Sequence, residues 1–184
     1  MAITYHDLYL KTRMALSSAG IEAAQLEARE ILCAAAEKTA EELYRDISLY
    51  TTDAIAEKTE ALQARRLAGE PIAYLLGEWS FCGLPFFVSP AALIPRVDTE
   101  MLAQLAMNRL KEHPGHTRIL DLCAGTGCVG LTAAALLKNT RAVLVDLSDG
   151  ALDLCKRNIR RHKLTGRAVS LKGDALQAPS HALG

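Results

Sequence analysis

Two acidic residues and a glycine turn in the second half of the chain have the spacing of a nucleotide-binding site. Asp121 lies four residues before Gly125-x-Gly127, and Asp146 ends a later apolar run. Glycines let a ligand approach the backbone without a Cβ in the way, and a helix that begins there presents unpaired N–H groups. A carboxylate such as that of Asp146 can accept hydrogen bonds from both hydroxyls of a ribose. These residues therefore predict a site for a ligand that contains a nucleoside.

The segments around these residues predict a βαβ unit that would hold them in place. Residues 119–122 and 142–145 are short apolar runs typical of buried parallel strands, and residues 129–137 between them are expected to form a helix. A third strand is expected over residues 168–171. In a doubly wound α/β sheet these strands have the order 3-2-1. The predicted fold class is therefore α/β.

Two classes of cofactor fit this unit, and Asp121 distinguishes them. Gly125-x-Gly127-x-x-Gly130 matches the dinucleotide fingerprint, which is a weak pattern on its own. The position of Asp121 is normally apolar in a dinucleotide-binding strand, whereas a carboxylate there can hold the glycine loop or meet a cationic ligand through water. S-adenosylmethionine carries a sulfonium and an amino group and has no pyrophosphate. The pattern favours a methyl donor over NAD, and a turn with no ligand is the remaining alternative.

The composition is that of an ordinary soluble globular protein. Half of the 184 residues are hydrophobic and the formal net charge is zero, whereas a general nucleic-acid-binding protein would show a basic excess. Five cysteines without a CxxC pair are expected to be reduced and mostly buried, and we expect no metal site. Without a signal-peptide core or an apolar run of transmembrane length, the expected location is the cytoplasm.

Residues 1–69 are expected to form a small helical bundle. Thr39 and Glu42 form a capping-box pattern that predicts a short helix in its middle. Longer helices are expected over residues 5–19, 22–38 and 53–68. Nothing in the bundle has the spacing of a catalytic site. The charged residues near its end form either a partner-facing edge or a solvated helix face, and they are Arg65, Arg66 and Glu70.

Residues 70–90 are rich in aromatic residues and predict a β-hairpin around Gly83. A hairpin with so much aromatic surface must pack on something, because two strands alone are marginally stable. The sequence LIPRVDTE follows, immediately before a helix expected over residues 101–110. Either Asp98 or Thr99 caps that helix, or residues 96–100 line the mouth of the cofactor pocket.

The segments GEWSFCGLPFFVSPAALIPRVDTE and ILDLCAGTGCVGL together resemble the HemK/PrmC family. These proteins are the protein-(glutamine-N5) methyltransferases of class I peptide-chain release factors. The resemblance covers nearly the whole chain. It implies a helical bundle for substrate recognition over residues 1–69, a β-hairpin linker over 70–97, and over 98–184 the first part of a class I, Rossmann-like methyltransferase domain. It also implies S-adenosyl-L-methionine as the cofactor and release factors as the partners.

The resemblance assigns roles to residues of the predicted cofactor site. The loop from Cys123 to Gly127 would contact the methionine part with Thr99 beside it, Asp146 would hold the ribose, and Asp174 with Ala175 would border the adenine. The predicted cofactor-binding residues are Thr99, Asp121, Cys123, Ala124, Gly125, Thr126, Gly127, Asp146, Asp174 and Ala175. The chain departs mildly from the family at Cys123-Ala124, where Gly with Thr or Ser is usual, and at Val97, where a second Pro is common.

The Asn-Pro-Pro-Tyr motif of the family is absent from this sequence, which contains no Asn-Pro pair. In the family, the Asn side chain and a Pro carbonyl accept hydrogen bonds from the substrate amide and orient its nitrogen lone pair towards the methyl group. We therefore predict no catalytic residue in this chain. We expect it to be an N-terminal portion, inactive by itself, of an enzyme that methylates the glutamine of the Gly-Gly-Gln loop.

Two other functions stay open at this point. One is an adenine methyltransferase acting on DNA or RNA, which the neutral charge and the LIPRVDTE segment argue against. The other is a non-catalytic binding module, in which the bundle recognises a partner and the βαβ unit is a scaffold. Direct binding to nucleic acid or to a membrane is not expected. Binding of S-adenosylhomocysteine, measured together with methyl transfer to a release factor, would separate these classes.

Overall fold

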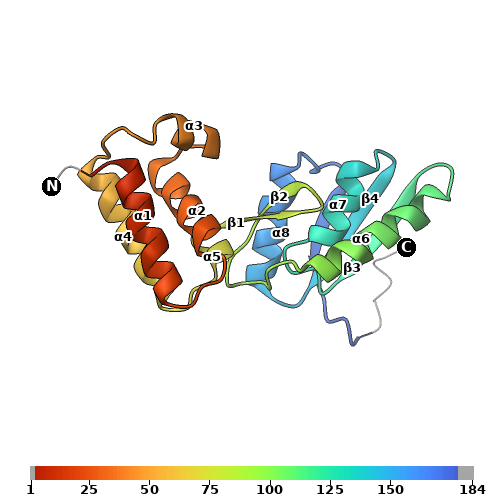
Figure 1. Cartoon of the computed structure of the whole chain (residues 1–184). Coiled ribbons are helices and arrows are strands. Elements are labelled where there is room, and N and C mark those ends of the chain that lie inside the picture. Colours follow the sequence, from red (N-terminus) through yellow and green to blue (C-terminus); the bar gives the residue numbers. More distant parts are fainter. Residues whose placement is uncertain (1–2, 178–184) are drawn as a thin grey trace. The chain divides into compact units, whose positions relative to one another are not determined.

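The computed structural model describes residues 3–177 and divides the chain into two compact units, Met1–Leu76 and Gly77–Gly184 (Figure 1). The predicted β-hairpin lies inside the second unit. The domain boundaries proposed after residues 69 and 97 stay predictions, and the end of the third predicted domain, residues 178–184, lies outside the described residues. Across the described residues, no helix is both long and apolar enough to cross a membrane.

The first unit is helical, as predicted. Its described helices are α1 (Tyr5–Ser18), α2 (Ala24–Ala36), α3 (Ala40–Arg45), α4 (Asp53–Leu67) and α5 (Ile72–Leu76). The predicted capping box is present at α3: the Thr39 side chain accepts a hydrogen bond from the Glu42 N–H, and the Glu42 carboxylate accepts one from the Thr39 N–H. Helix α5 was not predicted. It follows Pro71, whose fixed φ suits the start of a helix and whose carbonyl accepts from the Leu75 N–H.

Buried leucine, isoleucine and alanine side chains from α1, α2 and α3 form the core of the first unit. The charged residues near its end are paired within the unit. Arg66 forms a mostly buried ion pair with Glu27, with 2.6 Å between Nε and Oε2, and Arg65 pairs with Glu70 at 2.6 Å. All three residues are therefore paired within their own unit. Their charges are explained without contact to another protein.

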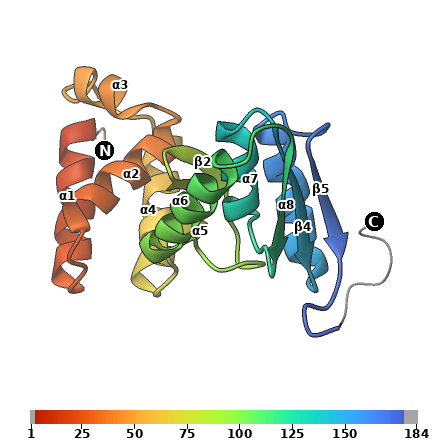
Figure 2. The ribbon, with the colours of Figure 1, turned by 90° about the vertical axis from the view of Figure 1, so that its right-hand side faces the viewer.

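The second unit contains a parallel sheet in the predicted order (Figure 2). Its strands are β3 (Thr117–Leu122), β4 (Thr140–Asp146) and β5 (Ala168–Lys172). They pair as β3-β4-β5, so the strand that carries Asp121 lies at one edge and the strand that ends in Asp146 lies in the centre. The two crossover helices are α7 (Cys128–Leu136) and α8 (Asp149–Arg161). Parallel strands require such crossovers, which cover the sheet on one side.

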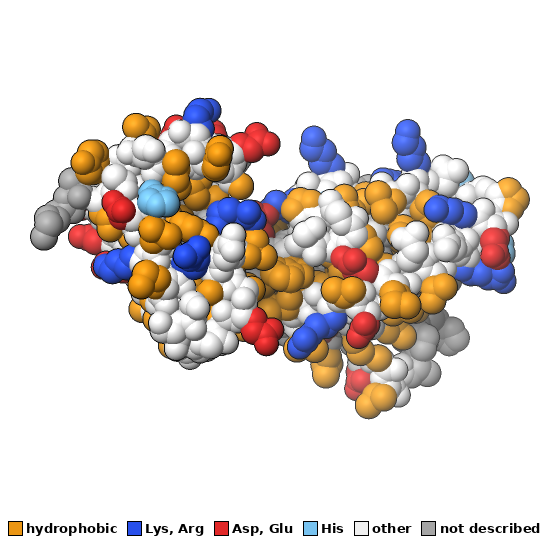
Figure 3. Space-filling model, in the orientation of Figure 1, with side chains coloured by type: hydrophobic (Ala, Val, Ile, Leu, Met, Phe, Trp, Pro, Cys, Tyr) orange, Lys and Arg blue, Asp and Glu red, His pale blue; other side chains and the backbone are white. Residues whose placement is uncertain are grey.

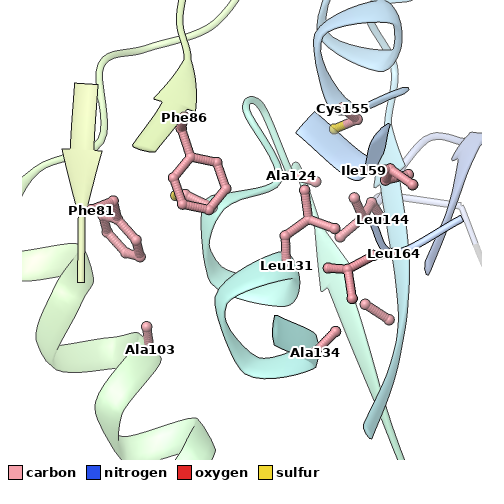
Figure 4. Close-up of a cluster of buried hydrophobic side chains, with 12 residues drawn as sticks. Phe81, Phe86, Ala103, Ala124, Leu131, Ala134, Leu144, Cys155, Ile159 and Leu164 are labelled. Atoms are coloured by element: carbon pink, nitrogen blue, oxygen red, sulfur yellow. The ribbon is translucent and has the colours of Figure 1, made fainter. Parts of the chain in front are cut away.

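Helix α8 was not predicted, although the sequence contains its signals. The Ser148 side chain caps it by accepting a hydrogen bond from the Ala151 N–H at 3.3 Å. Its apolar residues recur at helical spacing and are buried: Ala151, Leu152, Leu154, Cys155 and Ile159. The side chains of Leu131 on α7, Leu144 on β4 and Ile159 on α8 belong to one buried cluster (Figure 4). The two helices therefore pack on the same face of the sheet.

The opposite face of the sheet is exposed within the described residues. Successive side chains of a strand point to opposite faces of the sheet, so that every second side chain of the two outer strands points away from α7 and α8. The exposed apolar side chains are Leu120 and Leu122 on β3 and Val169 and Leu171 on β5, with exposed fractions between 40% and 49%.

The predicted hairpin consists of β1 (Glu78–Phe81) and β2 (Leu84–Phe87). Its two-residue turn, Cys82-Gly83, has positive φ at both positions, which suits the twist of a two-residue hairpin. The rings of Phe81 and Phe86 are buried, 6.1 Å apart and edge to face, and they join the same cluster as α7 and α8 (Figure 4). The aromatic surface that required a packing partner thus finds it in the core of the second unit. Helix α6 (Val97–Lys111) follows the hairpin.

Candidate functional site

The loop from Cys123 to Gly127 connects β3 to α7 and depends on its glycines in different ways. Gly127 has a φ of +77°, and a Cβ there would lie 2.9 Å from a methyl carbon of Leu144. A Cβ at Gly130 would lie 2.5 Å from Leu144. These two glycines let α7 approach the central strand. Gly125 also has a positive φ, but its nearest neighbour is the Cβ of Ala92 at 3.6 Å, so the space above its Cα is open.

Asp146 holds this loop from the end of β4. Its Oδ2 accepts a hydrogen bond from the Gly125 N–H at 2.8 Å, and its Oδ1 accepts one from the Ser148 N–H at 3.0 Å. An ionised carboxylate has about four lone-pair sites. The two backbone bonds therefore orient Asp146 and leave further acceptor capacity on both oxygens.

Asp121 binds the beginning of α7 rather than the tip of the loop. Its Oδ2 accepts a hydrogen bond from the Gly130 N–H at 2.9 Å. Burial raises the pKa of Asp121 to about 6; the Gly130 hydrogen bond acts to lower that pKa, and the negative charge of Asp146 raises it. The carboxylate is thus costly to ionise, and its hydrogen bond fixes the helix relative to the edge strand.

A cavity of about 420 Å³ lies between the glycine loop and the segment that precedes α6. The loop, together with Asp121 and Asp146, lines one side, and residues 91–96 with Thr99 line the other. The predicted site residues brought together here are Thr99, Asp121, Cys123, Ala124, Gly125, Thr126 and Asp146. A volume of this size is in the range of small-molecule and cofactor sites.

Three predicted site residues do not line this cavity. Gly127 is buried behind the loop, against Leu144. Asp174 and Ala175 lie in the turn after β5, where the two carboxylate oxygens of Asp174 accept hydrogen bonds from the Leu176 N–H and the Gln177 side chain.

The LIPRVDTE segment divides between the cavity and the hairpin. Helix α6 begins at Val97 with Arg96 as the N-cap residue and without a side-chain cap, so the prediction that Asp98 or Thr99 caps it is wrong. Arg96 and Thr99 line the cavity, as the alternative prediction has it. Glu100 instead accepts a hydrogen bond from the Cys82 N–H at 2.7 Å and ties α6 to the turn of the hairpin.

Asn158 is a residue of this region that the sequence reasoning missed. Its fully buried side chain lies on α8, donates to the carbonyl oxygens of Phe87 and Thr126, and accepts from the Phe87 N–H. The available signal was an asparagine in the apolar stripe of a helix, next to Ile159. That signal indicates a satisfied buried amide but does not identify its partners.

The cysteines around the loop are structural or open to solvent. The Cys155 thiol donates to the Gly125 carbonyl at 3.2 Å, and burial raises the pKa of Cys155 to about 12 and that of Cys128 to about 11. Cys123 is exposed and lies in the cavity lining. Among residues 3–177 no group of three acidic, histidine or cysteine side chains could hold a metal ion.

The first unit has a depression of its own, about 620 Å³ in volume, between α1, α2 and α3. Apolar side chains dominate its lining, and Leu26 and Tyr44 in it are 50% and 82% exposed. Hydrophobic side chains gather on the surface of this unit beside charged ones (Figure 3). Charged and polar lining is supplied by His6, Glu22 and Arg29.

Comparison with known proteins identifies both units. Residues 7–77 match the model of the PrmC N-terminal domain, and residues 96–182 match that of the methyltransferase small domain. A release factor glutamine methyltransferase of Nitratidesulfovibrio vulgaris is 35% identical over 176 residues, or 93% of this chain. The chain belongs to the PrmC family.

Other relatives of this PrmC-family chain have the same name. The release factor glutamine methyltransferase of Geobacter sulfurreducens is 36% identical over 91% of the chain, and that of Escherichia coli K12 is 47% identical over 58% of it. The chain spans 57% of the Nitratidesulfovibrio and Geobacter proteins and 38% of the Escherichia coli protein. Among solved structures, the N-terminal domain of human METTL16 in complex with SAH has a TM-score of 0.41 at 15% identity, covering 79% of this chain and 56% of that one.

Proposed function

We propose that this chain carries the methyl-donor site and the substrate-recognition unit of an S-adenosylmethionine-dependent methyltransferase that acts on the Gly-Gly-Gln glutamine of class I release factors. The observation that carries the proposal is the 35% identity, over 93% of the chain, to a protein named release factor glutamine methyltransferase. The match to the methyltransferase small domain spans the glycine loop and Thr99.

The chemistry of the cavity suits this cofactor. S-adenosylmethionine supplies an electrophilic methyl group on a sulfonium. The open space above Gly125, which a longer side chain would fill, gives the backbone a close approach to the methionine part. The carboxylates of Asp121 and Asp146 place negative charge near a cationic ligand, and the spare lone pairs of Asp146 can accept from ribose hydroxyls. Asp174 and Ala175 would border the adenine from the turn after β5.

The first unit is proposed to recognise the release factor. We place that contact on its apolar depression, whose lining includes the charged residues Glu22 and Arg29. We place the protein in the cytoplasm, where release factors act, without direct binding to nucleic acid. No residue of this sequence is assigned a role on the substrate amide, because the sequence contains no Asn-Pro pair.

Calorimetric titration of the 184-residue chain with S-adenosylhomocysteine tests the site. We expect binding that Asp146→Ala weakens by about 1–3 kcal/mol, because the ribose hydroxyls and the Gly125 N–H then lose their acceptor, and that Gly125→Val weakens at least as much by filling the cavity. Asp149→Ala is the matched control, since that exposed carboxylate pairs only with Lys172 among the described residues. Unchanged affinity in both site variants would contradict the assignment.

Radiolabel transfer tests the reaction. We expect no methylation of a release factor by this chain above a cofactor-free control, because an acceptor for the substrate amide is missing from its sequence. Methylation of a release factor by the chain would show that another residue performs that role. Methylation of a DNA or RNA oligonucleotide instead would favour the adenine-methyltransferase alternative.

A further inference from the structure

The amide of Asn158 lies at the junction of the two walls of the candidate cavity. Its Nδ2 donates to the Thr126 carbonyl at 2.9 Å, in the glycine loop that lines one wall. The same nitrogen donates to the Phe87 carbonyl at 3.1 Å, and the Oδ1 accepts from the Phe87 N–H at 2.8 Å. Phe87 is the last residue of β2, and after three further residues the chain reaches the other wall, which residues 91–96 and Thr99 form.

The pairing with Phe87 has the form of a strand pairing. By exchanging two hydrogen bonds with one residue, the Asn158 side chain acts as an extra ladder position on the outer edge of β2. The amide has no solvent exposure, and both amide hydrogens and the oxygen are bonded. A buried polar group in this state resists displacement, because any movement of either wall leaves a donor or acceptor unsatisfied.

Other contacts near Asn158 attach the glycine loop and the hairpin to α8, and one attaches the turn of the hairpin to α6. Cys155, one turn before Asn158, donates its thiol to the Gly125 carbonyl. Arg157 and Arg161 lie over the Phe87 ring, with their guanidinium carbons 4.6 and 4.3 Å from its centroid. Glu100 fixes the turn of the hairpin through the Cys82 N–H. Helix α8 thus supports the loop and the hairpin, and Asn158 bonds to the backbone of both.

We propose that Asn158 is a positioning residue for the methyl-donor site: its buried amide sets the spacing between the glycine loop and the facing wall of residues 91–96 and Thr99. The inference rests on the proposed function only for the identity of the ligand. It predicts that a disturbance of the hairpin reaches the loop through Asn158.

The test compares Asn158→Asp with Ile159→Ala in the 184-residue chain. Asp has the shape of Asn and keeps the acceptor of the Phe87 N–H, but it replaces the donor nitrogen with an oxygen that repels the carbonyl oxygens of Phe87 and Thr126. Ile159 is its buried neighbour on α8, and its side chain lies in the apolar core. Amide hydrogen exchange is measured at Phe87, Thr126 and Gly127, with the Leu144 amide of the central strand as the reference for the stability of the unit. S-adenosylhomocysteine affinity is measured by calorimetry.

We expect Asn158→Asp to accelerate exchange at Phe87 and the glycine loop together, beyond the change at Leu144, and to weaken S-adenosylhomocysteine binding by about tenfold, the equivalent of one lost hydrogen bond. Ile159→Ala should change the exchange rates of all these amides in proportion to that of Leu144. It should leave the affinity for S-adenosylhomocysteine within about twofold. Equal effects of the two variants, relative to Leu144, would overturn the proposal and make Asn158 a purely structural residue.

Glu100→Ala provides a second variant that leaves α8 unchanged. It removes the acceptor of the Cys82 N–H at the far end of the hairpin. If Asn158 transmits the position of the hairpin, exchange at Thr126 and Gly127 rises in this variant, and an unchanged loop refutes the transmission even where Asn158→Asp fails to fold. Failure of the unsubstituted chain to bind S-adenosylhomocysteine would contradict the proposed function, while the exchange measurements still decide the role of Asn158.

Discussion

The two units use their polar side chains differently. In the first unit, the least exposed of the described ion pairs joins two side chains, Arg66 and Glu27, although the buried Thr59 hydroxyl donates to the Ile55 carbonyl. In the second unit, polar side chains bond to backbone instead: Asp146 to Gly125 and Asn158 to Thr126. The units also differ in charge. Residues 1–76 contain eight Lys and Arg against 12 Asp and Glu, a net −4, and residues 77–184 contain 13 against nine, a net +4, so the formal total is zero.

The difference follows from how the backbone hydrogen bonds of each unit are satisfied. Helices satisfy their own backbone, and caps such as Thr39 satisfy their ends, so polar side chains in the first unit are free to pair with one another. The cavity of the second unit is made of loops whose N–H and C=O groups have no ladder, and buried backbone groups need partners. Side chains supply them. Single polar substitutions should therefore cost more in the second unit than in the first.

The largest effect that we expect comes from closing the space between α7 and the central strand. Gly130→Val places a side chain where a Cβ already meets a Leu144 methyl carbon at 2.5 Å. Overpacking costs about 1–3 kcal/mol and occasionally more, and this close approach places the variant at or above the upper end. Denaturant unfolding followed by the fluorescence of Trp79, the single tryptophan, reports on the second unit. Gly166→Ala is the control, because a Cβ there meets nothing within 4 Å. Equal stability of the two variants would show that α7 can shift freely.

Arg167 offers the sharpest test of side-chain-to-backbone bonding. Its Nη1 donates to the carbonyl oxygens of Ala134, Leu137, Lys138 and Thr140, at and after the end of α7. We expect Arg167→Met to destabilise the second unit by about 2–3 kcal/mol, since these carbonyls lose a charged donor. The loss is measured by the same fluorescence-detected unfolding. A cost below about 1 kcal/mol would mean that water replaces the guanidinium.

Asp121 makes the stability of the second unit depend on pH. Burial raises the pKa of Asp121 to about 6, whereas an unfolded aspartate has a pKa of about 3.9. Between these two pKa values the folded state binds more protons than the unfolded state, so the free energy of unfolding falls as pH rises. The full cost of ionising the buried carboxylate is present above about pH 6. Asp121→Asn keeps an oxygen acceptor for the Gly130 N–H and removes the charge. We expect it to stabilise the unit by about 2–3 kcal/mol at pH 7 and hardly at all at pH 3.

Unfolding curves of both proteins at pH 3 and pH 7 measure this difference. Asp153→Asn is the control, because that carboxylate is exposed and pairs with Lys156. An equal gain from Asp121→Asn at both pH values would place the ionisation of Asp121 outside this range.

The smallest effect is expected in the first unit. Arg65 forms two hydrogen bonds to the Glu70 carboxylate, but the Arg65 side chain is exposed and that of Glu70 is partly exposed. Exposed pairs of this kind contribute about 0.2–1 kcal/mol. Arg65→Met should therefore lower the stability of the first unit by less than about 1 kcal/mol, measured by thermal unfolding followed by circular dichroism. A loss as large as that of Arg167→Met would remove the contrast between the units.

Local patterns predict the elements of this chain, and tertiary contacts decide the site. The strands, the glycine turn and the capping box at Thr39 each follow from a few adjacent residues, and the structure contains them. The roles of Glu100 and Asn158 could not be predicted in this way, because their partners are 18 and up to 71 residues away in sequence. Helix α8 was missed despite a capping serine.

The same distinction applies to the predicted site residues. Residues within or next to the glycine loop, such as Gly125 and Asp146, lie on the cavity because the βαβ geometry brings strand ends together. Asp174 was assigned by resemblance alone; it does not line the cavity, and its carboxylate accepts hydrogen bonds within its own turn. Spacing along the chain thus places residues on a shared sheet edge but does not state which side chains remain available to a ligand.

The exposed thiol in the glycine loop makes the cavity accessible to chemical labelling. Burial raises the pKa of Cys128 and of Cys155, so both are protonated and shielded at neutral pH, and it also raises the pKa of Cys33 and of Cys82. Cys123 is the exposed cysteine and lines the cavity. A fluorinated thiol reagent used in limiting amount would therefore report from this one position. Its NMR signal would follow the filling of the cavity in the unaltered sequence.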